Sequence, residues 1–275
     1  MNNLSRMTLG TAGLCLPDYP PGSPHPQPSP TESIALVRRA YDLGIRHFDC
    51  ARGYGASEDL LATAFDLVPP VDVRITSKSA PEYYLQARKA SPFRPMLLHN
   101  PTVEQLWLWW HNAAGASVNT PEQANIAIAA GYKHLQCPHW VLDQRYAKAG
   151  IFEAAKRHGV TTYARQPFGR GLLLAEPGDD LDDSIGMSGV DLIYAYHGIC
   201  RRRKISYVEA ALRFSLESPA DQIVFGCSSI AQLEENIHVA TTDPPESWPA
   251  CYAELLSTFA DAGLVLASVC TPEAR

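Results

Sequence analysis

Short apolar runs alternate along the chain with longer segments in which apolar residues recur at helical spacing. In residues 31–44, for example, Ile34, Val37 and Tyr41 share one helical stripe, and Gly44 follows as a C′ residue. The apolar runs predict strands at 7–11, 45–49, 71–77, 96–99, 114–118, 132–137, 160–164 and 221–225. Helices are expected at 31–44, 59–67, 101–112, 121–130, 147–158, 191–200, 206–217 and 230–240.

A regular strand-then-helix order indicates a parallel sheet whose strands are joined by crossover helices. Two architectures fit that order: an open doubly wound sheet, and a closed barrel for which about 250 residues is usual. No G-x-G-x-x-G turn follows the first strand, and the strand runs number eight. We therefore predict an α/β fold, a (β/α)8 TIM barrel with a closed parallel sheet. Residues 1–275 would form a single domain, with the tail 241–275 packed on the barrel.

Composition narrows the class of protein. Hydrophobic residues make up 46% and charged residues 19%, and the net charge is −6, which argues against a nucleic-acid or anionic-lipid partner. No apolar run approaches the roughly 18 residues of a membrane span, and the first residues lack the layout of a signal peptide. The seven cysteines form no C-x-x-C pair, which is typical of reduced thiols. We expect a cytoplasmic protein, a monomer or small homo-oligomer.

Three predicted strands end on polar residues that packing alone would not favour, namely Asp49, Lys78 and His99. Tyr54 follows Asp49 by five residues, in a turn between Gly53 and Gly55. Each residue alone has a structural explanation, such as helix capping for an aspartate or packing of an aliphatic stem for a lysine. Barrel enzymes place catalysis at the carboxyl ends of their strands. Together the four side chains therefore predict one site at that end.

The chemistry available to these four groups is specific. A tyrosine hydroxyl with a pKa of about 10 is a weak acid at neutral pH. A lysine ammonium beside it would favour the phenolate and lower that pKa, and a carboxylate would fix the lysine. Histidine could orient a carbonyl oxygen toward the hydroxyl. Such a site protonates an oxygen while a hydride attacks the carbon, and because no side chain supplies hydride, a nicotinamide cofactor is required.

The segment Phe48-Asp-Cys-Ala-Arg-Gly-Tyr-Gly-Ala-Ser-Glu58 resembles the F-D-T-A-x-x-Y-G-x-S-E signature of the aldo/keto reductases. Further segments that resemble the family, in the family's order, are Ser77-Lys78, Leu98-His-Asn-Pro101, Gly115-Ala-Ser117, Gln136, Gln166-Pro-Phe-Gly-Arg-Gly-Leu172, Ala210-Ala-Leu-Arg213 and Gln232-Leu-Glu-Glu-Asn236. The resemblance runs from about residue 7 to 240.

The resemblance implies that Tyr54 is the general acid/base, assisted by Lys78 and Asp49, and that His99 orients the substrate carbonyl. It also implies NAD or NADP as cofactor, and a small-molecule substrate: an aldehyde, ketone or lactol-type sugar, or the corresponding alcohol. The implied cofactor-binding residues are Gly10, Thr11, Asp49, Ser117, Gln136, Arg165, Gln166, Pro167, Phe168, Arg170, Gly226, Ser228, Gln232, Glu235 and Asn236.

Within that set, each group resembles a separate part of the family's cofactor site. Ser117 and Gln136 would bind the nicotinamide carboxamide, and the loop 166–172 would hold the pyrophosphate. Residues 226–236 would form the adenosine end, where the backbone of Ser228-Ser229 at a helix start could bind phosphate. Glu235 and Asn236 would contact the adenine.

Four departures from the family pattern change these expectations. Val118 follows Ser117 where many members have asparagine, so one carboxamide contact is missing or moves to Asn119. Arg165 takes the place of the aromatic residue that stacks on the nicotinamide. Gln232 stands where NADP-using members often carry arginine, which makes NAD plausible.

The fourth departure is one of length. Only 21 residues separate Lys78 from His99, and 18 separate His99 from Ser117, both fewer than is usual in the family. We therefore expect the fourth and fifth units of the barrel to be shortened, with trimmed outer helices or one irregular unit.

Two other functions remain as alternatives. A non-catalytic or regulatory barrel of the same family would be indicated by loss of Tyr54 or Lys78, and both are present. A metal-dependent barrel hydrolase could use His134, Cys137 and His139 as zinc ligands. Strand alternation, however, would direct His134 and Cys137 to opposite faces. We expect no metal site.

Overall fold

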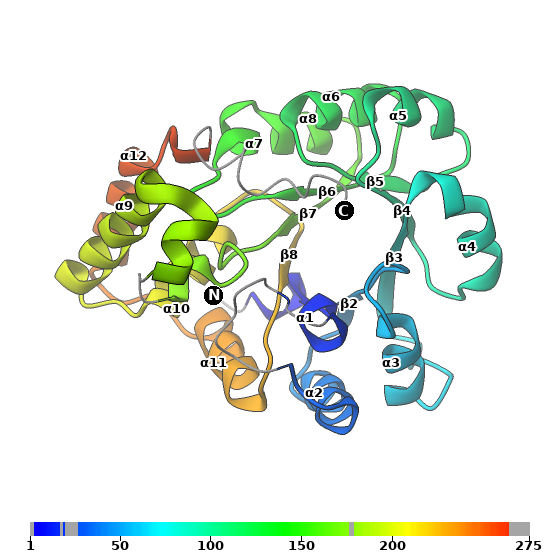
Figure 1. Cartoon of the computed structure of the whole chain (residues 1–275), viewed down its shortest axis with the longest axis horizontal. Helices are drawn as coiled ribbons and strands as arrows, with labels where there is room; N and C mark the ends of the chain where they lie inside the picture. The colour runs from blue at the N-terminus through cyan, green and yellow to red at the C-terminus, as the bar shows by residue number, and fades with distance from the viewer. Residues whose placement is uncertain (1–2, 17–18, 20–26, 176–178, 264–275) are drawn as a thin grey trace.

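In the computed structural model, which describes residues 3–16, 19, 27–175 and 179–263, parallel strands close into a barrel (Figure 1). The strands are β1 (Met7–Gly10), β2 (His47–Asp49), β3 (Arg74–Ser79), β4 (Met96–His99), β5 (Gly115–Ser117), β6 (His134–Pro138), β7 (Thr161–Arg165) and β8 (Gln222–Phe225). Each strand pairs with the next in the sequence, and β1 also pairs with β8, where Met7 lies opposite Ile223. The predicted (β/α)8 TIM barrel is confirmed.

Helices surround the strands (Figure 1). They are α1 (Ala12–Cys15), α2 (Pro30–Asp42), α3 (Ser57–Ala64), α4 (Tyr84–Ala90), α5 (Val103–Trp109), α6 (Pro121–Ala129), α7 (Arg145–Lys148), α8 (Ile151–Arg157), α9 (Asp179–Arg203), α10 (Tyr207–Leu216), α11 (Ile230–Thr241) and α12 (Trp248–Thr258), with 3-10 turns η1 (Leu4–Arg6), η2 (Pro81–Tyr83) and η3 (Leu172–Leu174). Three features differ from the expectation. α1, α4 and α12 are additional helices, the segment expected at 147–158 is divided into α7 and α8, and α9 begins at Asp179 rather than at residue 191.

Local signals in the sequence explain where the helices begin and end. At the start of α2, Ser29 Oγ accepts a hydrogen bond from the Glu32 backbone N–H, and the Glu32 carboxylate accepts one from the Ser29 backbone N–H at 2.8 Å. This reciprocal pair is a capping box. Thr102 and Thr120 begin α5 and α6 in the same way. Gly44 follows α2 with φ of +100°, a left-handed conformation that a residue without Cβ adopts at no steric cost.

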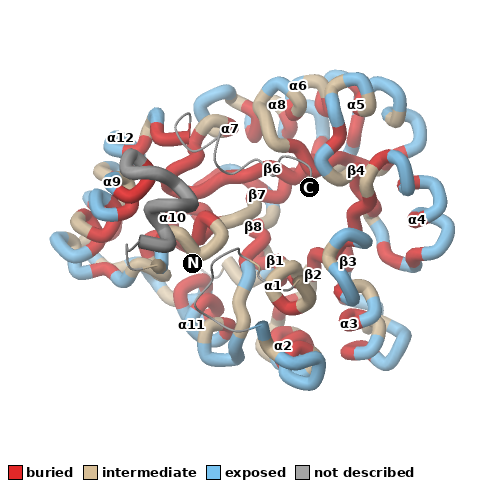
Figure 2. The backbone as a smooth tube through the Cα atoms, in the orientation of Figure 1, coloured by how far each residue is buried: buried red, intermediate tan, exposed pale blue. Residues whose placement is uncertain are grey.

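Most of the buried residues lie in the strands and on the inner faces of the helices, whereas the outer faces of the helices are exposed (Figure 2). Along β3 the side chains alternate between the two surfaces of the barrel wall. Ser77 bonds Glu58 on the outer helix α3, while Lys78 bonds Asp49 on the neighbouring strand β2. This period of two brings the terminal side chains of several strands into the barrel mouth.

The stretch between Lys78 and Ser117 is short because its helices are short. α4 and α5 have seven residues each, about two turns. The expectation of trimmed outer helices in this region is correct. The side chains of Trp107 and Leu108 on α5 remain 52% and 72% exposed.

Several expectations concern residues near the chain ends. α12 lies against α9 and α10: Glu254 accepts from Arg202 and Arg203, and Trp248 Nε1 donates to Glu217 at 3.1 Å. Residues 264–275 of the predicted tail are outside the described part of the chain.

The six described cysteines are free thiols, and Cys270 lies outside the described part of the chain. Within the described residues, no helix is long and apolar enough to cross a membrane.

Candidate active site

The four side chains expected at one site lie together at the carboxyl ends of β2, β3 and β4. Lys78 Nζ donates to Asp49 Oδ1 at 2.5 Å and to the Cys50 carbonyl at 3.0 Å. The same Nζ lies 5.0 Å from the centroid of the Tyr54 ring. The rings of Tyr54 and His99 meet edge to face, with centroids 5.5 Å apart and an interplanar angle of 85°. The structure thus brings together an acid, a lysine, a phenol and an imidazole.

Tyr54 reaches this cluster from the tight turn between β2 and α3. The Tyr54 N–H donates to the Ala51 carbonyl at 3.0 Å, and the Ser57 N–H donates to the Tyr54 carbonyl at 3.1 Å. Gly55 has φ of +55°, and a Cβ there would lie 2.8 Å from the Cys15 carbonyl oxygen. The turn therefore needs glycine at this position both for its conformation and for its close approach to the end of α1.

The electrostatics of Tyr54 differ from the expectation based on sequence. Burial raises the pKa of Tyr54 above its usual value; Lys78 opposes this rise, and Asp49 adds to it. The expectation that Lys78 would lower the pKa is correct for that one interaction and wrong for the net shift. Desolvation outweighs the lysine because a phenolate at this position would lose its hydration. At neutral pH the group is therefore a phenol.

The pKa values of Lys78 and His99 are shifted in opposite directions. Burial alone lowers the pKa of Lys78, but the charge of Asp49, the proximity of Tyr54 and the hydrogen bond with Asp49 outweigh it, so the net pKa is raised. The lysine is accordingly an ammonium. Burial, reinforced by Lys78 and Arg165, lowers the pKa of His99 to about 3. The imidazole is therefore neutral at physiological pH, with one ring nitrogen able to donate a hydrogen bond.

A chain of hydrogen bonds extends from Asp49 across the barrel mouth. Gln136 Nε2 donates to Asp49 Oδ2 at 2.8 Å, and Ser117 Oγ donates to Gln136 Oε1 at 3.2 Å. On the other side, Thr11 Oγ1 donates to the Asp49 backbone carbonyl at 2.9 Å. Lys78 and Gln136 thus bond both oxygens of the Asp49 carboxylate. Gly10, before Thr11, lies beside β8, where a Cβ would be 3.2 Å from Val224 Cγ1.

Arg165 and Asn119 form a pair that the sequence did not predict. Arg165 Nη2 donates to Asn119 Oδ1 at 2.6 Å and to the Val118 carbonyl at 3.1 Å. The Asn119 amide also donates to Asn100 Oδ1 at 3.2 Å. The side chain offered as a replacement carboxamide contact is therefore engaged with Arg165 and Asn100. These contacts hold the guanidinium at the mouth, close enough to lower the pKa of His99.

The loop after β7 is closely packed and unusual in its backbone. Gln166, Gly169, Arg170 and Gly171 all have positive φ, and a Cβ on Gly169 would lie 2.2 Å from the Trp140 ring. Pro167 and Phe168 of this loop are buried. The Nε atoms of Arg165 and Arg170 are buried without a hydrogen-bond partner within the described residues. Of the two, Arg170 lies in the loop expected to hold the pyrophosphate, and a cationic donor there fits an anionic ligand.

In the segment after β8, where phosphate binding is expected, one of the two backbone amides already has a partner within the protein. The Ser228 backbone N–H and hydroxyl both donate to Gln232 Oε1, at 2.8 and 3.1 Å, so Gln232 already satisfies that amide. Ser229 Oγ accepts from the Gln232 N–H and caps α11. Gly226 faces open space, with no atom within 4 Å of a Cβ placed there. On α11, Glu235 is exposed and Asn236 is buried.

The residues considered as zinc ligands lie in separate environments. His134 Nδ1 is 3.1 Å from the Tyr163 hydroxyl, whereas the His139 ring packs between Phe152 and Phe214. Across the ranges that the structure describes, no three His, Cys, Asp or Glu side chains are grouped so that they could hold a metal ion.

Comparison with known proteins identifies the family to which the chain belongs. The model of the aldo/keto reductase family matches residues 6–95 and 115–251. The chain belongs to the aldo/keto reductase family. An uncharacterized oxidoreductase of Bacillus subtilis, YqkF, is 32% identical over 94 residues. That match covers 31% of this chain and less than a third, 30%, of the relative.

Solved aldo/keto reductases share the barrel. A glycerol dehydrogenase from Gluconobacter oxydans has a TM-score of 0.64 at 17% identity over 92% of both chains. An aldo-keto reductase from Bacillus halodurans, in its holo form, has a TM-score of 0.67 at 18% identity over 91% of both chains. These likenesses show the fold. The family match omits residues 96–114, which contain β4, α5 and His99, the region of the shortened helices.

Proposed function

We propose that this aldo/keto reductase family member is a nicotinamide-dependent oxidoreductase that interconverts a small-molecule carbonyl and its alcohol. The observation that carries the proposal is the placement of Lys78 Nζ between Asp49 Oδ1 and the Tyr54 ring, with His99 edge-on to that ring. This arrangement supplies a proton donor and an orienting group at one point, as carbonyl reduction requires.

Tyr54 is the group that we assign to proton transfer. Its raised pKa keeps it protonated at neutral pH, so it can donate to a carbonyl oxygen that gains negative charge. The nearby Lys78 ammonium stabilises the phenolate that remains, which limits the cost of the transfer. Neutral His99 donates a hydrogen bond to the same oxygen and fixes the carbonyl in front of the phenol.

A nicotinamide dinucleotide, when bound, supplies or accepts the hydride. We assign its carboxamide to Ser117 and Gln136, because Ser117 Oγ can still accept a hydrogen bond and Gln136 Nε2 has a second N–H to donate. The buried, unpartnered Nε of Arg170, in the loop 166–172, suits the pyrophosphate. Both NAD and NADP fit these contacts, because none of them involves the 2′ position of the ribose.

The decisive experiment separates cofactor binding from turnover. NADH and NADPH are titrated against the purified protein by fluorescence, and aldehydes, ketones and sugars are then screened with the better-bound cofactor. We expect saturable binding of at least one cofactor and turnover that Tyr54→Phe lowers at least about 100-fold. Absence of binding at millimolar cofactor would overturn the proposal. Binding without turnover of any carbonyl would favour the regulatory alternative.

A further inference from the structure

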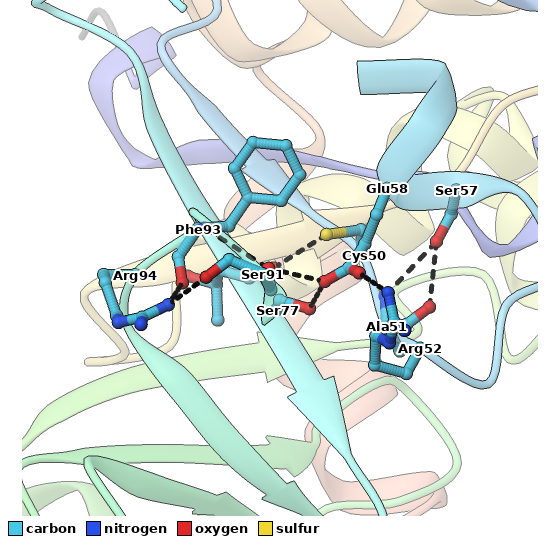
Figure 3. Close-up of polar contacts among 10 residues, drawn as sticks. Cys50, Ala51, Arg52, Ser57, Glu58, Ser77, Ser91, Phe93 and Arg94 are labelled. Atoms are coloured by element: carbon cyan, nitrogen blue, oxygen red, sulfur yellow. Dashed lines mark hydrogen bonds and ion pairs between the residues drawn. The ribbon is translucent and has the colours of Figure 1, made fainter. Parts of the chain in front are cut away.

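Glu58, on α3, contacts three separate segments of the chain (Figure 3). Its Oε1 accepts from Ser77 Oγ at 2.5 Å and from Ser91 Oγ at 2.8 Å, and its Oε2 accepts from Arg52 Nη1 at 2.7 Å. Only 11% of the Glu58 side chain is exposed. The carboxylate is therefore almost buried, with three hydrogen-bond donors around it.

Two of these contacts end close to a residue of the site in the sequence, and the third ends in the segment before β4. Arg52 stands two positions before Tyr54 in the turn, and Ser77 directly precedes Lys78 in β3. Ser91 lies in the segment that leads from α4 to β4, the strand that ends at His99. The Arg52 backbone N–H also donates to the Lys78 carbonyl at 2.8 Å, so a backbone hydrogen bond joins the turn directly to β3.

We propose that Glu58 is a positioning residue, whose carboxylate fixes the turn that carries Tyr54 against the strand that carries Lys78. The inference rests on the proposed function, because its consequence is the distance between a proton donor and the ammonium that stabilises its anion. Glu58 itself cannot reach the substrate, since Ser77 and Lys78 face opposite surfaces of the barrel wall.

This carboxylate contributes to the placement of the turn rather than to its shape. Ser57 Oγ donates to the Ala51 carbonyl at 3.0 Å and shapes the turn internally, independently of Glu58. The Arg52 backbone N–H and the close approach of Gly55 to Cys15 also hold the turn, and the Glu58 carboxylate adds a side-chain contact from Arg52 to these. Hydrogen bonds from charged donors and to a carboxylate are about twice as strong as neutral ones. Losing them should let an intact turn move relative to β3.

Two substitutions of Glu58 distinguish the contribution of its charge from that of its hydrogen bonds. Glu58→Gln keeps an oxygen that can accept from Ser77 and Ser91, but it loses the charge opposite Arg52. Glu58→Ala removes all three contacts. Since a displacement of about 1 Å can cost about 100-fold in rate, we expect kcat to fall roughly 10- to 100-fold for alanine and less for glutamine. KM and the cofactor Kd should stay within about threefold, because neither the carbonyl nor the dinucleotide touches Glu58.

The titration of Tyr54 supplies a readout that a purely structural role would leave unchanged. Lys78 lowers the pKa of Tyr54, so a turn that moves away from Lys78 should raise it further. Tyrosines labelled with 13C at the ζ position report this by NMR, with the Tyr54 signal assigned by its loss in Tyr54→Phe. We expect the Tyr54 titration to move to higher pH in both Glu58 variants, and the alkaline limb of kcat for alcohol oxidation to move with it.

Glu254→Gln is the matched control. Glu254 also accepts from arginines, Arg202 and Arg203, but it lies on α12, away from the strand ends that form the site. This variant should keep the kcat and the Tyr54 titration of the wild type. If it loses as much kcat as the Glu58 variants, general destabilisation explains the effect and the proposal is wrong.

Other results separate this inference from the proposed function. If the wild type turns over no carbonyl, the proposed function fails, but the NMR titration of Tyr54 still tests Glu58. An unchanged Tyr54 titration in both Glu58 variants overturns the positioning role. If Glu58→Ala does not fold, Glu58→Gln and Ser77→Ala decide, because each removes only part of the network.

Discussion

The Lys78 ammonium and the Asp49 carboxylate form an ion pair whose side chains are 0% and 4% exposed. A charge buried this deeply is tolerated only with an opposite charge and further hydrogen bonds, which Cys50 and Gln136 provide. Because the pair is surrounded by the strand ends, the proposed catalytic charges also contribute to the stability of the barrel mouth.

Asp49→Asn should therefore destabilise the fold as well as the site. It leaves the Lys78 charge buried without its counter-ion, for which a loss of about 3–5 kcal/mol in the free energy of unfolding is typical. Urea denaturation measures this loss. The double variant Asp49→Asn/Lys78→Met, which removes both charges, should recover part of it. A single variant within about 1 kcal/mol of the wild type would show that the pair contributes little.

Tyr54→Phe should lower kcat by about 100- to 10,000-fold, the usual range for general acid catalysis, and leave the cofactor Kd within a few-fold. The hydroxyl is expected to act chiefly in the transition state, which is why kcat falls more than binding. Steady-state kinetics and cofactor fluorescence measure the two effects. Tyr252→Phe, on α12, is the control and should retain activity. Near-full activity of Tyr54→Phe would mean that another group donates the proton.

Cofactor preference should depend on Gln232. Its amide oxygen already binds Ser228, and it offers no positive charge to the 2′-phosphate of NADP. We expect NAD(H) to be used at least as well as NADP(H), and Gln232→Arg to shift kcat/KM toward NADP(H) about tenfold through a charge-assisted contact. A wild type that favours NADPH about a hundredfold, and does not respond to the substitution, would place phosphate recognition elsewhere.

Buried neutral histidines should make the protein sensitive to acid. Burial lowers the pKa of His99 to about 3 and that of His139 to about 4, below the usual value of about 6.5. The unfolded chain therefore binds more protons, and stability falls as the pH drops from about 6.5 to about 4, by on the order of 3 kcal/mol per histidine. His139→Phe should give a shallower decline in urea unfolding across this range. Parallel curves for the two proteins would contradict the assignment.

Gly169→Ala should damage the loop after β7. Its φ of +56° disfavours a side chain, and the new Cβ would lie 2.2 Å from the Trp140 ring. Gly131→Ala is the matched control, because Gly131 has φ of +87° but no atom within 4 Å of the Cβ position. The control should cost about 1–2 kcal/mol from backbone strain alone. Gly169→Ala should cost more and weaken cofactor binding, as shown by unfolding and fluorescence; equal losses would exclude a role for the Trp140 contact.

Features set by neighbouring residues were the ones that could be predicted from the sequence. The apolar run ending at His99 predicts β4 with the bounds observed, because a buried strand and its polar terminal residue are a local pattern. Their places at the carboxyl ends of predicted barrel strands likewise predict that Asp49 and Lys78 meet. The strands and most helices followed from such patterns, with ends displaced by a few residues where caps and turns compete; α9 is the exception, because it begins 12 residues before the expected helix.

Features that depend on residues distant in the sequence were not predicted. The net pKa shift of Tyr54 depends on desolvation by the assembled barrel, so the neighbouring lysine alone gave the wrong direction. The contact of Arg165 with Asn119 joins residues 46 positions apart, and that of Glu58 with Ser91 spans 33. Gln232 folds back onto Ser228 through a choice of rotamer that composition does not determine.

The pairing of β1 with β8 also determines the order in which the molecule can be completed. Met7 and Ile223 are adjacent in the sheet, so the barrel closes by pairing its first strand with the strand that is synthesised last. Until β8 leaves the ribosome, β1 and β7 are exposed sheet edges, whose free N–H and C=O groups can pair with another chain. Closure of so long a loop is slow. The nascent protein therefore stays open to pairing with another chain until the final strand is in place.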